Sequence, residues 1–321
     1  MTTWRAAAID LGSVGVDTWG VDFALPARLL PALVPPVTDL GPLVPAVRDA
    51  AGLGTTRVVA PASHDTASAV AAIPVHAQHS AYISSGTWSA MGAVSPEPVV
   101  TEAVHAAGFT NEGGVQGTTR PLKNITGLGL VQECRRSWAQ AGDELDYAAL
   151  TALGERTGPF DAVVDPDDPS LLSPDDMPRA LAELGQRRGE KVPSTQGELV
   201  RLALESLGCK YRQTLEQLEA ITGHRIEVIH VVGGGSKNTL LCQLTAELCN
   251  RPVLAGPVET PALGNLLAQA PSAKVIGGWQ QARTLVRQSC NLVTYHPRDS
   301  GRWESTYHRF CDKQARPTPP T

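Results

Sequence analysis

A strand, a glycine-rich loop and a helix follow one another in the second half of the chain, and this succession restricts the fold class most. Ile226–Val232 has the apolar register of a strand, Gly233–Gly235 forms a tight loop, and Asn238 caps a predicted helix with leucines at helical spacing. Glycines at such a junction let backbone N–H groups approach an anion or a nucleotide, although plain strand-to-helix turns use glycine too. The loop matches neither GxGxxG nor GxxxxGKS/T, so the Rossmann and P-loop fingerprints are missing. The segment predicts an α/β fold.

A second strand-to-helix junction carries the best candidate for chemistry. Ser63–Val70 follows a predicted strand over Thr56–Ala60 and leads into small, helix-compatible residues. At the end of that strand, the Asp65 carboxylate is flanked by His64 and Thr66, which suits abstraction of a proton from a substrate hydroxyl. Aspartate and serine also cap helices commonly, so a pure capping role for Asp65 is equally open from these residues alone.

Composition and charge exclude several classes of protein. The chain has 321 residues, a length typical of about two domains, and its 42% of hydrophobic residues allow a sizeable core. The 27 basic and 32 acidic residues give a net charge of −5, which argues against a nucleic-acid-binding protein. No apolar run approaches the length of a membrane span, and the apolar segment at the N-terminus is too short for a secretory signal.

The cysteines and histidines indicate neither a disulfide framework nor a structural zinc site. None of the six cysteines forms a CxxC pair, and the eight histidines lack zinc-protease spacing. We therefore expect reduced, mostly buried thiols and a cytoplasmic location.

Further elements are predicted from local signals. The longest helix is expected over Ser194–Gly223, and Asp165–Asp176 is interpreted as a solvated Pro/Asp loop with two helix starts. Thr260 is expected to be an N-cap, with Pro261 as the first helical residue. The remaining expected elements are a helix over Leu43–Ala51, two strands within Ser80–Val94, a strand over Phe109–Val115, a strand over Val14–Phe23, and a helix after Asn124.

Short motifs along the chain occur in the order of one known family. They are Asp17–Phe23, Ser63–Val70, Ser84–Ser89, Thr110–Gly114, Leu122–Ile125, Val232–Gly235 and Ala262–Asn265. Together they resemble the FGGY family of carbohydrate kinases, and within it the branch that phosphorylates L-rhamnulose. The resemblance runs from about Ala6 to about Phe310. It implies an actin-like, ribonuclease-H-like fold of two α/β domains, and MgATP-dependent phosphorylation of L-rhamnulose at its terminal hydroxyl.

The resemblance also implies roles for single residues. Asp65 matches the catalytic base of the family, and Asp10 stands where such kinases place a carboxylate near Mg²⁺. The implied cofactors are ATP and Mg²⁺, and the implied partners are a small-molecule sugar and the nucleotide. The sugar-contacting positions match Gly20, His64, Thr66 and Asn124, and the ATP-contacting positions match Thr87, Gln132 and Gly234.

The first domain is much shorter than the family pattern. After Ser13 the family continues with a phosphate turn, two strands and a helix, whereas here Val14 follows directly. After Leu25 the family again has a long block with further sugar contacts, which is missing here. We therefore expect the first domain to be truncated and to expose apolar surface, which predicts poor solubility, an oligomer or a partner that covers it.

The first gap creates a topological conflict. In the family the strand ending at Asp10 and the strand Val14–Phe23 are parallel neighbours, and a parallel pair needs a crossover of about a dozen residues. The link Leu11–Ser13 is far too short for this. A hairpin or a displaced strand is expected instead, so Asp10 and Gly20 are expected to lose their family geometry.

These features lead to a domain division and to competing functions. Residues 1–70 are predicted to be the remnant of a sugar-binding domain, 71–310 a nucleotide-binding domain, and 311–321 a tail. One hypothesis is a working kinase. The other is an inactive remnant that retains a nucleotide-binding module. An actin-like scaffold or sugar sensor has no support beyond the fold.

Overall fold

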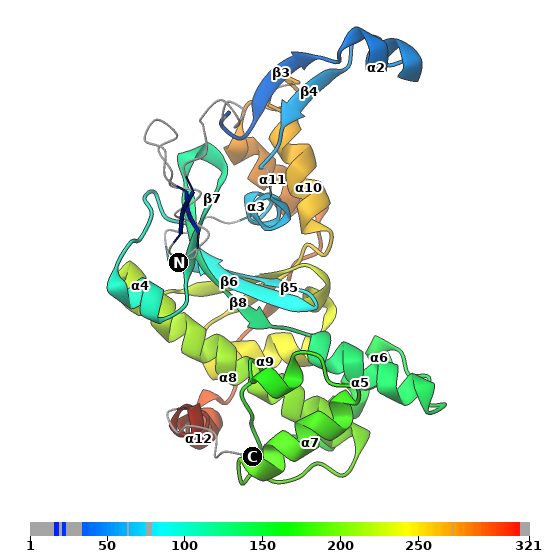
Figure 1. Ribbon diagram of the computed structural model, residues 1–321, viewed down its shortest axis with the longest axis vertical. Helices are drawn as coiled ribbons and strands as arrows, with labels where there is room; N and C mark the ends of the chain where they lie inside the picture. The colour runs from blue at the N-terminus through cyan, green and yellow to red at the C-terminus, as the bar shows by residue number, and fades with distance from the viewer. Residues whose placement is uncertain are drawn as a thin grey trace. The chain divides into compact units, whose positions relative to one another are not determined.

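The computed structural model describes two compact units (Figure 1). The described residues are 16–18, 21–23, 34–62, 64–74, 79–271 and 273–314. Unit 1 is formed by Met1–His76, Ala93–Leu122 and Glu259–Cys290, and unit 2 by Ala77–Gly92, Lys123–Val258 and Asn291–Thr321. These units group residues by contact, whereas the predicted boundary at residue 70 concerns the two kinase domains. The domain boundaries therefore stay a prediction.

Unit 2 is built on a mixed β-sheet. At its centre β9 (Val228–Val232) pairs in parallel with β5 (Ser80–Ser85) on one side and with β10 (Val253–Ala255) on the other. β11 (Val293–Tyr295) runs antiparallel to β10 at one edge, and β6 (Trp88–Ala93) lies beyond β5, next to β8 (Thr119–Thr126). Parallel strands joined through helices confirm the predicted α/β class.

The longest helix of unit 2 is α8 (Gln196–Thr222), as the apolar spacing predicts. Thr195 and Glu198 form a capping box at its start, and Gly223 ends it in the left-handed conformation at φ 75°. α8 packs against α9 (Thr239–Cys249) and α6 (Tyr147–Thr157). The three helices are labelled in Figure 1. The other helices of this unit are α5 (Gly129–Gln140), α7 (Met177–Arg187) and α12 (Glu304–Gln314).

Unit 1 is organised around two helices that approach closely. α3 (Asp65–Ala71) packs against α10 (Thr260–Gln269). α4 (Glu102–Ala106), α11 (Trp279–Ser289) and β7 (Thr110–Gly113) also belong to this unit, and β7 pairs antiparallel with the first half of β8. A Cβ added to Gly264 of α10 would overlap the carbonyl oxygen of Ser68 in α3, so only glycine permits this approach.

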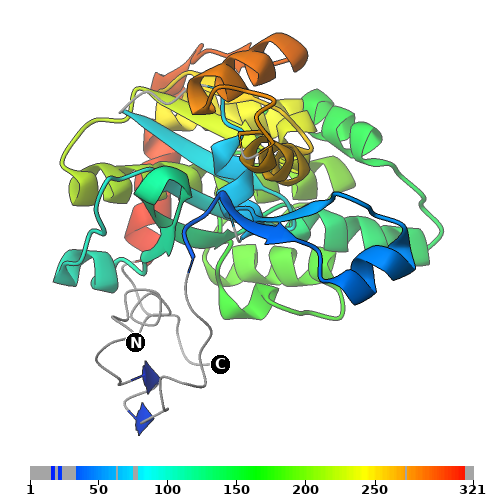
Figure 2. The same ribbon diagram turned by 90° about the horizontal axis from the view of Figure 1, so that it is seen from above.

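A two-stranded ribbon with a terminal helix leaves apolar side chains in solvent. β3 (Thr38–Pro42) pairs with β4 (Arg57–Ala60), and α2 (Pro45–Ala51) connects them, with no buried residue in the described helix (Figure 2). Val44 is 63% exposed and Leu40 52%. The expected exposure of apolar surface is therefore present in this part of the chain. A partner that covers it stays a prediction.

The strand expected over Val14–Phe23 is wrong as a single element. β1 (Val16–Thr18) and β2 (Val21–Phe23) pair antiparallel, with Thr18 opposite Val21. A short connection between strands permits an antiparallel pair, whereas a parallel pair needs a long crossover. Asp10 and Gly20 lie outside the described residues, so the roles predicted for them stay predictions.

The helix predicted after Asn124 is α5, which begins at Gly129. Several other local predictions differ from the structure. Asn124 itself lies in β8, a strand that the sequence analysis does not predict and that contains Pro121, a residue normally excluded from a sheet interior because it lacks an N–H. Thr260 is the first residue of α10 and not its N-cap, because the helix begins one residue earlier, after Glu259. The loop Asp165–Asp176 is not simply solvated, since Asp165 and Asp167 form ion pairs with a buried lysine.

All six cysteines are free thiols, and four of them are buried. This agrees with the thiols expected from their spacing. Among the helices that the structure describes, none has the length and apolar character needed to cross a bilayer.

The Gly264 contact makes a stability prediction. Gly264→Ala should lower the free energy of unfolding by about 1–3 kcal/mol, because the added methyl group overpacks the α3–α10 contact. Helix propensity alone predicts the opposite sign, a gain of about 1 kcal/mol. Urea denaturation measures the difference. Gly54→Ala, in the same unit with open space around its Cβ, is the control, and equal unfolding midpoints for both variants would contradict the packing argument.

Candidate functional site

In unit 1, Asp65 stands at the start of α3 with its carboxylate open to solvent. His64 is the N-cap residue, and both its ring Nδ1, at 3.3 Å, and Asp65 Oδ1, at 2.6 Å, accept from the backbone N–H of Thr66. The Asp65 side chain is nevertheless 76% exposed. The carboxylate therefore supports the helix start and is also accessible, so the capping and proton-accepting interpretations do not exclude each other.

A pocket of about 540 Å³ opens at this carboxylate. It is lined by Asp65, His64 and Ser68 from the α3 side and by Pro261, Ala262 and Asn265 from α10. Two of the residues predicted to contact sugar, His64 and Thr66, thus lie at Asp65. Asn124 lies on β8 within unit 2.

Two residues that sequence reasoning missed stand behind His64. His64 Nδ1 lies 3.2 Å from Asp65 Oδ1 and 3.8 Å from Glu112 Oε2. Glu112 Oε2 in turn accepts a 2.9 Å hydrogen bond from the buried guanidinium of Arg120. Glu112 lies in the Thr110–Gly114 motif, which is interpreted from the sequence only as a strand that enters a glycine turn. A charge-assisted bond of this kind holds Glu112 in a fixed place beside the histidine.

Unit 2 contains a larger cavity of about 640 Å³, within the range typical of small-molecule sites. Gln132 and Gly234 line it, and the hydroxyl of Thr87 donates to Gln132 Oε1 at 2.8 Å. The structure therefore brings together the three residues predicted to contact ATP. Their role in binding stays a prediction. Tyr147, Glu155, Lys237, Asn238 and Thr239 also line this cavity.

The glycine loop after β9 explains the shape of this cavity. Gly233 has φ 82°, and a Cβ there would lie 2.9 Å from the Ser85 carbonyl oxygen. A Cβ on Gly235 would overlap the Ser85 hydroxyl, whereas Gly234 has open space. The outer two glycines therefore let the loop dock on the end of β5, and the middle one leaves room for a ligand.

The beginning of α9 places positive charge at one side of this cavity, whose lining also includes the Glu155 carboxylate. Asn238 accepts from the Leu241 N–H at 2.9 Å as the N-cap, and Lys237 stands exposed just before it. The positive end of a helix dipole and a lysine ammonium both favour phosphate oxygens. The arrangement suits a nucleoside phosphate.

A second turn, between β8 and α5, holds Thr87 in place. The N–H groups of Gly127 and Gly129 both donate to the Thr87 carbonyl oxygen, at 3.1 and 3.0 Å. A Cβ on Gly127 would lie 2.7 Å from the Gly86 carbonyl oxygen, which explains the glycine. Sequence reasoning missed this turn, although the alternation in Thr126-Gly127-Leu128-Gly129 is a visible signal.

The described residues do not supply a resident metal centre. Across residues 34–62, 64–74, 79–271 and 273–314, no group of three or more His, Cys, Asp or Glu side chains could hold an ion. Asp10, the predicted carboxylate near Mg²⁺, lies outside this part of the chain. A magnesium ion that enters with a nucleotide is held largely by phosphate oxygens and water.

Comparison with known proteins gives relatives that are longer than this chain. A sequence profile of the C-terminal domain of the FGGY family of carbohydrate kinases matches residues 81–273. Rhamnulokinase from Bacteroides thetaiotaomicron is 42% identical over 275 residues, which cover 86% of this chain and 56% of that protein. Rhamnulokinase from Enterococcus faecalis is 38% identical over 304 residues, covering 92% of this chain and 61% of that protein. The chain spans about half the length of the curated relatives it matches.

Solved structures show the same fold at lower identity. Xylulose kinase from Rhodospirillum rubrum matches with a TM-score of 0.65 at 19% identity, over 88% of this chain and 56% of that one. Gluconate kinase from Lactobacillus acidophilus matches with a TM-score of 0.66 at 13% identity, over 91% and 58%. The predicted α/β kinase fold is thereby confirmed. The profile match and the relatives together show that the chain belongs to the FGGY family of carbohydrate kinases.

Proposed function

We propose that the chain acts in MgATP-dependent phosphorylation of L-rhamnulose to L-rhamnulose 1-phosphate. The observation that carries the proposal is the exposed Asp65 carboxylate at the mouth of a pocket, beside His64. The similarity to proteins named rhamnulokinase supports the choice of sugar. A sugar hydroxyl is a weak nucleophile at neutral pH, so a carboxylate that accepts its proton is what the reaction needs.

In the proposed reaction, the terminal hydroxyl oxygen of the sugar forms a bond to the γ-phosphorus of ATP. The bond from that phosphorus to the β–γ bridging oxygen breaks, ADP leaves, and the hydroxyl proton passes to Asp65. Such transfer depends mainly on positioning and on neutralisation of phosphate charge. We assign the neutralisation to backbone amides of the Gly233–Gly235 loop, to Lys237 and to the Mg²⁺ that accompanies ATP.

The second candidate is a non-catalytic chain that retains a nucleotide-binding module. It is favoured by the position of the 640 Å³ cavity, all of whose lining residues belong to unit 2. We further infer a cytoplasmic location, which the free buried thiols support. A partner or a second copy over the β3–α2–β4 ribbon is supported by its exposed valines and leucines.

The nucleotide cavity makes a binding prediction. Gly234→Val should raise the Kd for ADP by about tenfold or more, because a branched side chain fills open space that a ligand would occupy. Stability should hardly change, because an added Cβ meets no atom within 4 Å. Calorimetric titration and a thermal shift measure the two effects. Gly301→Val, in the same unit with equally open surroundings, is the control, and normal ADP binding by Gly234→Val would place the nucleotide elsewhere.

The catalytic assignment predicts the behaviour of an Asp65 variant. ADP release from MgATP should depend on L-rhamnulose and should fall at least about 10²-fold in Asp65→Asn, which removes the proton acceptor. Asparagine supports helix starts as well as aspartate, so the variant should stay folded. Asp49→Asn, an exposed aspartate on α2, is the matched control.

The outcomes separate the two candidates. Sugar-dependent release that survives in Asp65→Asn would show that Asp65 is not the base. A folded chain that binds ADP but shows no sugar-dependent release would establish the nucleotide-binding module and reject the kinase.

A further inference from the structure

Helix α8 holds a neighbouring chain segment through buried polar side chains. The Glu205 carboxylate accepts from the N–H groups of Phe160 and Asp161, at 3.0 and 2.9 Å, and the Ser206 hydroxyl accepts from the Val164 N–H at 3.0 Å. We name residues 160–168 the strap. Three of its backbone N–H groups thus donate to side chains of one helix, and this fixes the strap along α8.

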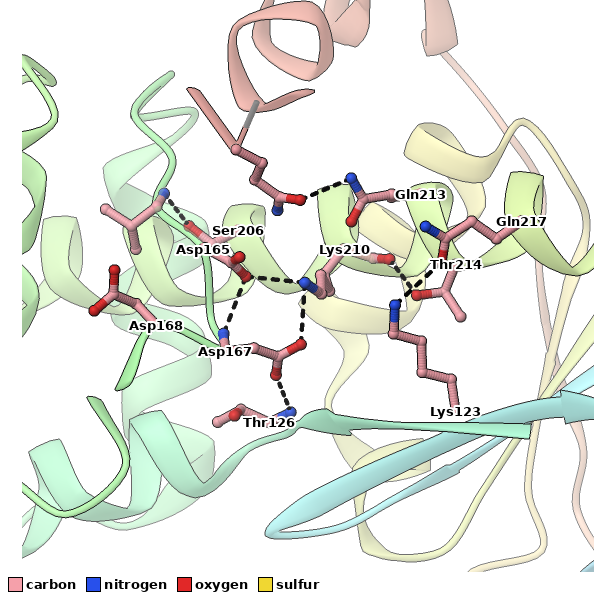
Figure 3. A network of polar contacts seen from close by, with 12 residues as sticks. Lys123, Thr126, Asp165, Asp167, Asp168, Ser206, Lys210, Gln213, Thr214 and Gln217 are labelled. Atoms are coloured by element: carbon pink, nitrogen blue, oxygen red, sulfur yellow. Dashed lines mark hydrogen bonds and ion pairs between the residues drawn. The ribbon is translucent and has the colours of Figure 1, made fainter. Parts of the chain in front are cut away.

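Lys210 completes this attachment at the far end of the strap. Its ammonium lies 3.0 Å from both Asp165 Oδ1 and Asp167 Oδ2. Dashed lines mark both ion pairs in Figure 3. The lysine side chain is 6% exposed, whereas the two carboxylates keep about a quarter of their surface in solvent. Burial opposes the charged form, yet the two carboxylates outweigh it and raise the pKa of Lys210. The lysine therefore stays charged and ties both aspartates to α8.

The other oxygen of Asp167 reaches the end of a strand. Asp167 Oδ1 accepts from the backbone N–H of Thr126 at 2.7 Å. Thr126 is the last residue of β8, and the next residues form the Gly127–Gly129 turn that donates two hydrogen bonds to the Thr87 carbonyl oxygen. A continuous set of contacts thus runs from Lys210 through Asp167 and Thr126 to Thr87.

We propose that Asp167 and Lys210 are positioning residues for the nucleotide cavity. Neither is among the residues that line it, yet both fix the turn that orients Thr87 and its partner Gln132. The inference rests on the proposed nucleotide-binding function of that cavity. Without Lys210, the two aspartates lose the ammonium that pairs with both of them. The nearby charge of Lys123 offsets their mutual repulsion only in part, so they turn toward solvent, which removes the acceptor from the Thr126 N–H. The turn and Thr87 then lose their fixed position.

The competing explanation is that the cluster only stabilises unit 2. A matched control separates the two explanations. Arg212 lies on the same helix and forms a partly buried bidentate pair with Glu304, at 2.8 and 3.0 Å. That pair connects α8 to α12, and within the described residues it forms no hydrogen bond with the Gly127–Gly129 turn. Arg212→Met should therefore resemble Lys210→Met in lost stability but not in lost nucleotide affinity.

The experiment combines ADP titration with hydrogen exchange on the whole chain. Asp167→Ala and Lys210→Met should raise the Kd for ADP by about tenfold or more, while Arg212→Met stays within about twofold of the unaltered chain. Asp167→Asn keeps an oxygen acceptor for the Thr126 N–H and should recover part of the affinity. The amides of Gly127 and Gly129 should exchange faster in Asp167→Ala and Lys210→Met than in Arg212→Met.

Each result decides the question. Unchanged ADP affinity and unchanged exchange at Gly127 and Gly129, in variants that unfold at lower urea concentration, would overturn the inference and leave a purely structural cluster. If the unaltered chain binds no ADP, the proposed function fails. The exchange of the two glycine amides then still shows whether Asp167 and Lys210 hold the turn.

Discussion

The parallel pairing of β5 with β9 brings Ser85 and the Gly233–Gly235 loop together, and the proposed nucleotide cavity depends on this contact. Two strands that run side by side in the same direction end at the same edge of a sheet, so the turns that follow them meet there. Side chains on Gly233 or Gly235 would separate these turns. The absence of two Cβ atoms therefore determines the wall of the cavity, and the Lys237 ammonium and the start of α9 supply charge at that wall.

The residues at the proposed sugar site follow a different principle. Asp65 lies at the beginning of a short helix whose remaining residues are small and largely buried. Packing of α3 against α10 requires Gly264, so a residue far along the chain determines where α3 can lie. The position of an exposed acidic group thus depends on a buried contact between backbones, and substitutions there would act on the site without touching it.

Much of this arrangement could be predicted from local signals. The helix over α8, its end at Gly223 and the glycine loop after β9 follow from apolar spacing and capping rules, because those rules concern neighbouring residues. The position of β8 could not be predicted, since Pro121 is compatible with a strand only in the register that the surrounding sheet provides. The ion pairs of Asp165 and Asp167 could not be predicted from neighbouring residues either, because their partner, Lys210, is distant in the sequence. In the sequence, Lys210 resembles any other polar residue on a helix.

The hydrogen bonds at the start of α3 have a consequence for the chemistry of Asp65. Every bond that the structure gives this carboxylate ends on Oδ1, which takes the Thr66 N–H and hydroxyl and faces the His64 ring. Rotation of the group is thereby restricted, and in the proposed reaction Oδ2 would be the oxygen left for an incoming ligand. A substrate would meet one oxygen of fixed direction and not a freely turning pair. In the proposed reaction, the backbone amide that begins the helix would also select the atom that receives the proton, so neither property could be altered without the other.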